Sequence, residues 1–236
     1  MNFIYCLIIL LSSLSQSIYS VDFEVAAATG WKVEKRKHGF TVYSRDVKNS
    51  DIVGIKAEGI VDAPIEAVLA NLRTVEGSEK WTPSVTRKVT IRNISDLEAI
   101  TYTLNSMTWP VWDREFILHN ILKIDYKKKL LFVMSKSVHD KYKNFPRAKN
   151  AIMAQMDYSN IGFRPVGKNK CYVELTAFID AKGDIPAWML NFFQIKWPIK
   201  FLTSIEKRSK KGHPKLLPGI AKLVEELKVF MADNKK

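Results

Sequence analysis

Few residues of this chain have the types and spacing that catalysis requires. Its four histidines are dispersed and lack metal-ligand spacing, at His38, His119, His139 and His213. The chain contains no Gly-x-Ser-x-Gly elbow, His-Glu-x-x-His pair, phosphate-binding glycine-rich loop or Cys-x-x-Cys motif. Cys171 lies in a strand-like segment and is predicted to be a core residue rather than a nucleophile. We therefore predict no catalytic residues, no metal site and no cofactor; in an enzyme, only Tyr102 and His119 would be candidate acid–base groups.

The composition is that of a folded, basic protein. The 236 residues are 47% hydrophobic and 26% charged, with 37 Lys and Arg against 24 Asp and Glu, for a net charge of +13. This length suits one large domain or two small ones. Collagen, low-complexity disorder and a disulfide-stapled miniprotein are excluded, since there are only two cysteines, 9 prolines and 10 glycines. A basic surface indicates an acidic partner, either nucleic acid or an anionic membrane.

The first twenty residues carry no charge and have the pattern of an export signal. The apolar stretch at 3–14 is too short to span a bilayer, which needs about 20 residues, and Ser20 is a suitable small residue before a cleavage site. We predict a secretory signal at residues 1–20 and a periplasmic or secreted mature protein; the alternative is a short buried helix. Cys6 would leave with the signal, so Cys171 would remain without an internal disulfide partner.

The middle of the chain has the alternating pattern of β-strands. A short helix is expected at residues 21–28, and another from Asp62, as its N-cap, through Leu72. Short turns between sequential strands, such as His38-Gly39 and 127–129, imply a mostly antiparallel sheet. Strands are predicted at residues 31–36, 40–45, 52–61, 86–92, 98–106, 115–124, 130–135, 151–163 and 171–181.

The last long element is expected to be a helix with a wide apolar arc. Asp184 is its predicted N-cap, apolar side chains continue from Trp188 to Ile205, and Pro198 is expected to kink or interrupt it. A basic run at 207–211 ends it, and residues 213–236 are expected to form a basic amphipathic helical tail. Such a helix on a curved sheet gives a solid core or, if the layers are held apart, a hydrophobic cavity. Periodicity does not distinguish these outcomes.

Two motifs resemble segments of one protein family. Residues 108–116 (TWPVWDREF) resemble the Pro-aromatic-Pro-apolar-x-Asp-Arg-Asp-aromatic segment of the START family of lipid-transfer domains, close to its phosphatidylcholine-transfer branch. Residues 180–191 (DAKGDIPAWMLN) resemble the Asp-x-x-Gly-x-Ile-Pro-x-Trp-x-x-Asn segment at the start of that family's C-terminal helix. The resemblance implies an α+β helix-grip fold over residues 21–212: a curved antiparallel sheet wrapped around a long C-terminal helix, enclosing a hydrophobic cavity.

The resemblance also implies a function and a set of site residues. A START-like domain would bind a single lipid without catalysis and would transfer or sense it. Arg114 would meet a lipid phosphate or hydroxyl, or form a structural ion pair with Asp113 or another carboxylate. The lipid class stays open between phospholipid, sterol, fatty acid and other molecules. The residues expected to contact the lipid are Tyr102, Arg114, Phe116, Leu118, Trp188, Met189, Phe192 and Phe193.

An anionic membrane is the second expected partner of a monomeric protein. The C-terminal helix and the 107–113 loop would open as a gate, because indole rings and basic residues favour an anionic interface. The expected gate and membrane contacts are Trp109, Trp112, Lys207, Arg208, Lys210 and Lys211. The alternative is a helix-grip enzyme, a cyclase or hydrolase of a hydrophobic small molecule, with Tyr102 or His119 facing the cavity. No nucleic-acid partner is predicted, because nucleic-acid binding would account for the charge but not for the wide apolar helix.

Overall fold

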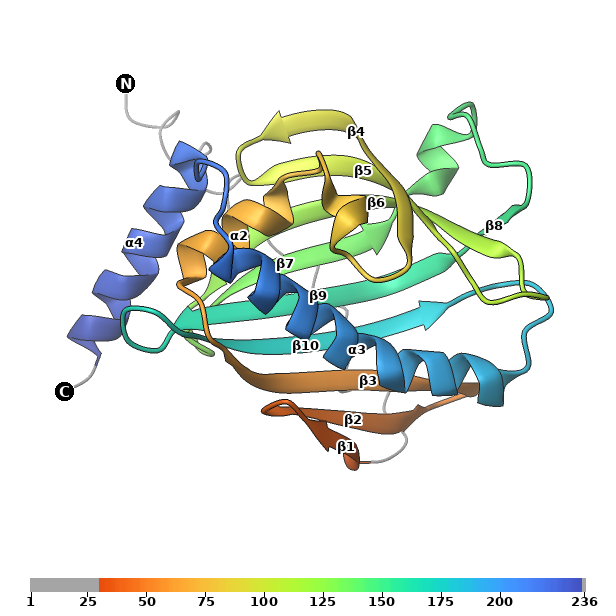
Figure 1. Cartoon of the computed structure of the whole chain (residues 1–236), viewed down its shortest axis with the longest axis horizontal. Coiled ribbons are helices and arrows are strands. Elements are labelled where there is room, and N and C mark those ends of the chain that lie inside the picture. The colour runs from red at the N-terminus through yellow and green to blue at the C-terminus, as the bar shows by residue number, and fades with distance from the viewer. Residues whose placement is uncertain (1–29, 235–236) are drawn as a thin grey trace, which may run out of the picture.

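The computed structural model describes residues 30–234 (Figure 1). The expected signal at 1–20 and the expected helix at 21–28 lie outside this range. Among the helices of residues 30–234, none combines the length and the apolarity needed to cross a bilayer.

Ten strands in this range form one curved sheet, in the order β1-β2-β3-β10-β9-β7-β6-β5-β4 with β8 beside β6. All neighbours on the main path pair antiparallel, which confirms the predicted sheet type. The predicted turn at His38-Gly39 joins β1 to β2. The strands are β1 Lys32–Lys37, β2 Phe40–Val47, β3 Ser50–Val61, β4 Val85–Ser95, β5 Glu98–Asn105, β6 Asp113–Asp125, β7 Leu130–Ser137, β8 Ala151–Met153, β9 Gln155–Pro165 and β10 Cys171–Asp180.

The segment predicted as one strand at 151–163 is two strands. β8 pairs parallel with β6, and after Ala154 the chain continues as β9 between β7 and β10. Ala154 is fully buried, and its N–H donates to the carbonyl of Glu115 at 3.0 Å. The change of partner strand leaves the apolar pattern continuous, so alternation alone does not reveal the break.

Three α-helices complete the described fold: α2 Ile65–Arg73, α3 Ala187–Lys210 and α4 Pro218–Asp233, with short 3-10 turns at Ser78–Lys80 and His139–Tyr142. Figure 1 shows α3 lying across the sheet, with α2 beside its C-terminal part and α4 beyond its C-terminal end. This arrangement confirms the predicted α+β helix-grip architecture.

The helix starts differ from the predicted ones. The N-caps are Pro64 and Pro186, and neither helix has a side-chain cap, so the predicted caps at Asp62 and Asp184 are wrong. Each proline fixes φ near −60° and has an extended ψ, so the helix begins at the next residue. The Asp62 carboxylate instead forms an ion pair with the Lys210 ammonium at 2.8 Å.

Pro198 does not interrupt α3. The helix is continuous from Ala187 to Lys210, with Pro198 buried inside it. A proline here removes one backbone hydrogen bond. The next turns pack Ile199, Leu202 and Ile205 into the core, and this packing compensates for the lost bond.

The main hydrophobic core joins the sheet to α2, the C-terminal half of α3 and α4. Ile220, Val224 and Leu227 of α4 are at most 3% exposed and belong to this core. Two polar contacts secure the helix: the Gly219 N–H donates to Asp96 Oδ2 at 2.7 Å, and Lys228 pairs with Glu66. The segment expected as a tail at 213–236 therefore contains a helix that packs into the same core as residues 30–212.

Candidate functional site

A cavity of about 570 Å³ lies between the sheet and α3, along residues 190–201 of the helix. Its walls come from β3, β4, β5, β6, β7, β9 and β10, from α2, α3 and α4, and from the loops at 74–84 and 106–108. The two halves of α3 thus have different roles. Ile199, Leu202 and Ile205 pack into the solid core, whereas Leu190, Phe193 and neighbouring residues face open space.

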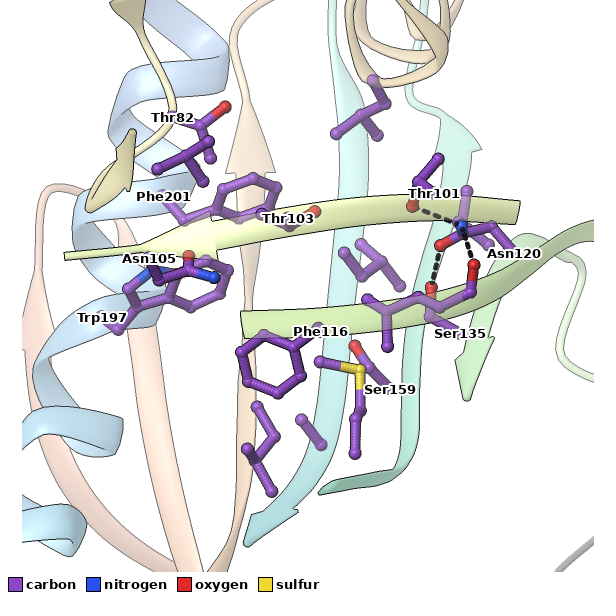
Figure 2. A pocket seen from close by; sticks show the side chains of 18 of the residues that line it. Thr82, Thr101, Thr103, Asn105, Phe116, Asn120, Ser135, Ser159, Trp197 and Phe201 are labelled. Atoms are coloured by element: carbon purple, nitrogen blue, oxygen red, sulfur yellow. Dashed lines mark hydrogen bonds between the residues drawn. The ribbon is translucent and has the colours of Figure 1, made fainter. Parts of the chain in front are cut away.

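Apolar side chains make up most of the cavity wall. Four of the apolar residues predicted to contact the lipid line it: Phe116 and Leu118 on β6, and Phe192 and Phe193 on α3. Trp197 and Phe201, which the sequence analysis did not single out as site residues, also line it and stack on each other with ring centroids 4.8 Å apart (Figure 2). Such a surface suits an apolar ligand.

A polar band crosses this apolar surface. The Asn120 amide donates to the Thr101 hydroxyl at 3.0 Å, and the Asn120 carbonyl oxygen accepts from the Ser135 hydroxyl at 2.8 Å (Figure 2). Ser159 continues the band, because β7 and β9 pair Ser135 with Ser159. The hydroxyls of Ser159 and Thr103 form no hydrogen bond within residues 30–234, although both residues line the cavity. The band therefore offers polar groups to a ligand.

Arg114 does not form the predicted ion pair, and because it lines the cavity its contact with a lipid stays a prediction. Its guanidinium is buried and donates to the backbone carbonyls of Trp112, Ala181 and Lys182, at 2.6 Å for Ala181 and 2.9 Å for Lys182. It forms no ion pair with a carboxylate of residues 30–234. Burial lowers the pKa of the guanidinium. A buried cation needs partners, and these carbonyls supply them, so Arg114 ties the start of β6 to the loop that precedes α3.

Replacement of Arg114 by methionine should destabilise the protein by about 3 kcal/mol, because it leaves several buried carbonyls without a donor. Urea denaturation of Arg114→Met measures the change. The control is Arg36→Met on the exposed strand β1, for which a change within about 0.5 kcal/mol is expected. Equal stability of the two variants would show that the contacts of Arg114 with the loop before α3 do not stabilise the protein.

The predicted acid–base candidates do not face the cavity. β5 and β6 pair Tyr102 with Ile117, and both belong to a second apolar cluster on the outer face of the sheet. Burial and the hydrogen bond from the Tyr102 hydroxyl to Glu115 raise the pKa of Tyr102 to about 12. His119 lies two residues beyond Ile117 on the same face and bonds to Glu98. The prediction that Tyr102 contacts the ligand is therefore wrong.

Cys171 is fully buried in β10, as the core prediction expected. Burial raises the pKa of its thiol to about 12, so the thiolate form is not accessible near neutral pH.

Trp188 and Met189 do not line the cavity either. The Trp188 side chain is 70% exposed, and Met189 is half-buried outside the cavity wall. Leu190, from the same turn, is buried and does line it. The difference comes from helical phase, since each residue along α3 is rotated by about 100° from the one before it.

The residues predicted to form the gate and the membrane contact lie in two separate places. Trp109 and Trp112 are 89% and 58% exposed, in a loop that Arg114 joins to residues 181–182 just before α3. Trp188 and Phe192, in the first turns of α3, are also exposed. The basic run at 207–211 ends the same helix, about 30 Å away at 1.5 Å per residue. Within that run, the Lys210 ammonium is paired with Asp62 and Glu206. The six predicted contacts therefore do not form one patch.

The sheet, the gripping helix and the apolar cavity define a helix-grip protein. The family model described as "START domain" matches residues 24–211, and the chain belongs to that family. Among curated relatives, an uncharacterized protein of Pseudomonas aeruginosa is 23% identical over 79% of this chain and 90% of its own length. Mouse START domain-containing protein 10 is 25% identical over 75% of this chain and 60% of its own length, which fits the predicted branch.

Solved structures show the same fold. The STAR-related lipid transfer protein of Xanthomonas axonopodis superposes with a TM-score of 0.67 at 22% identity, over 77% of this chain and 99% of the other. Human STARD10 superposes with a TM-score of 0.68 at 21% identity, over 90% of this chain and 84% of the other.

Proposed function

We propose that this protein binds one lipid molecule in its cavity and carries it between membranes. The observation that supports this function best is the apolar cavity of about 570 Å³ beneath α3, in a chain of the START family. The enzyme alternative needs an acid–base group in the cavity, and neither Tyr102 nor His119 faces it. Export through residues 1–20 is a further proposal, which rests on the sequence pattern alone.

Lipid carriage has a simple energetic basis. Exposure of each methylene to water costs about 0.8 kcal/mol, so a chain of roughly 16 methylenes costs on the order of 13 kcal/mol. Free lipid therefore crosses water very slowly. An apolar wall formed by residues such as Phe116, Leu118 and Phe193 offers surroundings close to those of the bilayer. The limiting step of transfer becomes the opening of the cavity.

Membrane docking would use the end of the molecule where α3 begins. Trp188 and Phe192 are exposed in the first turns of α3, and Trp109 and Trp112 are exposed in the loop that Arg114 joins to the chain just before α3. Aromatic rings favour the membrane interface. The Lys196 ammonium lies 3.4 Å from the centre of the Phe192 ring, so a positive charge accompanies the aromatic surface. The role of the run at 207–211 in docking stays a prediction.

The same end would contain the gate. Met107 and Thr108 of the loop between β5 and β6 line the cavity, and so do Phe192 and Phe193 of α3. Separation of this loop from the start of α3 would therefore open the cavity where the exposed aromatic rings meet the membrane.

A vesicle assay tests docking and transfer together. The double variant Trp109→Ser with Trp112→Ser should slow transfer of a fluorescent lipid between anionic vesicles by about tenfold, because it removes two interfacial rings. Equilibrium binding of the same lipid should not change, since neither ring lines the cavity. Wild-type transfer should also fall as salt rises.

The matched control is Ile94→Ser, which removes an exposed apolar side chain from β4. Its transfer rate should equal that of the wild type. If the double variant transferred lipid as fast as Ile94→Ser does, docking through the aromatic end would be wrong.

A further inference from the structure

Three lysines line the cavity: Lys196 and Lys200 on α3, and Lys88 on the sheet. Lys88 is near the middle of β4, where the register pairs it with Thr103 of β5, and both residues line the cavity. Side chains directly opposite each other in such a pair have Cβ atoms about 5 Å apart. The Lys88 ammonium and the free Thr103 hydroxyl therefore form a small polar site at one end of the polar band.

The Lys88 ammonium has no counter-ion among residues 30–234. It forms no ion pair or hydrogen bond with residues 30–234. Two carboxylates belong to lining residues, but Asp96 accepts from the Gly219 N–H and Glu98 bonds to His119. Burial and the nearby positive charge of Arg73 lower the pKa of Lys88. A desolvated cation beside a second cation is unfavourable unless an anion joins it.

Arg73 reinforces the positive character of this end of the cavity. Its guanidinium donates to the side-chain oxygen of Asn93 at 2.9 Å and to the carbonyls of Ser95 and Asp96 at 3.3 Å. These acceptors are neutral, and Arg73 forms no ion pair with a carboxylate of residues 30–234. A negative group near Lys88 would be attracted by both cations.

The volume of the cavity favours a small ligand. At about 30 Å³ for each group the size of a water molecule or a methylene, 570 Å³ holds roughly 19 such groups. A two-chain phospholipid carries roughly 30 methylenes in addition to its headgroup, whereas one acyl chain with a small headgroup matches the space.

We propose that the ligand is a single-chain lipid with an acidic headgroup, a carboxylate or a phosphate monoester, which accepts hydrogen bonds from the Lys88 ammonium and the Thr103 hydroxyl. The chain extends from there along the wall that includes Leu118 and Phe193. This inference rests on the proposed function and adds the chemical class of the ligand to it.

The test compares lipids that differ only in the headgroup. Delipidated full-length protein is titrated at neutral pH with oleic acid, oleyl alcohol, oleoyl lysophosphatidic acid and dioleoylphosphatidylcholine. The wild type should bind an acidic single-chain lipid about tenfold or more tightly than the alcohol, as expected for one charged hydrogen bond. The preferred acid, oleic or lysophosphatidic, identifies the headgroup as carboxylate or phosphate.

Lys88→Met should lose the preference for acid over alcohol, whereas Lys88→Arg should keep it because it retains the charge. Lys35→Met, an exposed lysine of β1, should bind as the wild type does. Lys88→Met should unfold at the same temperature as the wild type or a higher one, because it removes an unpaired charge from the cavity wall, and this measurement shows that the variant is folded.

Three results would overturn this inference and leave lipid carriage intact. They are equal binding of acid and alcohol by the wild type, an unchanged preference for acid in Lys88→Met, and tighter binding of dioleoylphosphatidylcholine than of any single-chain lipid. Failure of the wild type to bind any of the four lipids would instead overturn the proposed function itself.

Discussion

Ser159→Phe should abolish lipid binding and leave the fold intact. Ser159 lines the middle of the cavity, between Ser135 of β7 and Ala177 of β10 in the sheet register. Its hydroxyl forms no hydrogen bond within the described part of the chain, so the substitution removes no internal contact. The phenylalanine ring would fill space that the lipid chain must occupy. Titration with cis-parinaric acid, a fluorescent fatty acid, should show no saturable binding, while the free energy of unfolding changes by less than about 1 kcal/mol.

The matched control adds the same ring elsewhere. Val166 lies in the turn between β9 and β10 and is 42% exposed, so Val166→Phe should bind the probe as the wild type does. Undiminished binding by a folded Ser159→Phe would mean that the lipid binds outside the cavity.

Leu227→Asp should lower the free energy of unfolding by about 4 kcal/mol or more. Leu227 of α4 is fully buried in the main core. Truncation of a buried leucine alone costs about 2–5 kcal/mol, and a buried carboxylate without a partner adds to that cost. Urea denaturation of the full chain measures the change.

Val229→Asp is the control, since Val229 lies on the same helix two residues away and is 52% exposed. Its stability should change by about 0.5 kcal/mol at most. Similar small effects of the two substitutions would show that α4 is not part of the core.

The sequence was sufficient to predict the architecture. Motif residues 108–116 and 180–191 identified the family, and strand alternation located most strands to within a few residues. The cavity could not be derived in the same way. The apolar arc of α3 is compatible with a solid core or a cavity, and only the packing of Ile205 against the core, with Phe193 facing open space, distinguishes them.

The largest error in the candidate site came from strand register. Successive residues of a strand point to opposite faces, so a shift of one position exchanges the cavity face and the outer face. The prediction selected Tyr102, whereas Thr101 and Thr103 face the cavity. Thr103 faces the cavity because it pairs with Phe116, a correctly predicted wall residue. A single sequence does not show which residues pair across two strands.

Arg114 and Lys88 illustrate a second feature that the sequence does not predict, namely which cations of the cavity wall have partners. Both are cations that line the cavity, and the sequence motif drew attention only to Arg114. In the structure, backbone carbonyls from a distant loop satisfy Arg114, while Lys88 has no partner among residues 30–234. Whether a buried charge is satisfied depends on long-range contacts, which residue type and spacing do not specify.

Native mass spectrometry of the full chain tests the central claim most directly. After incubation with vesicles of mixed lipids and separation from them, each wild-type chain should carry one lipid, and Ser159→Phe should carry none. Two results would contradict the existence of a ligand site beneath α3. The wild-type chain could carry no lipid after separation from the vesicles, or it could carry no more lipid than Ser159→Phe does.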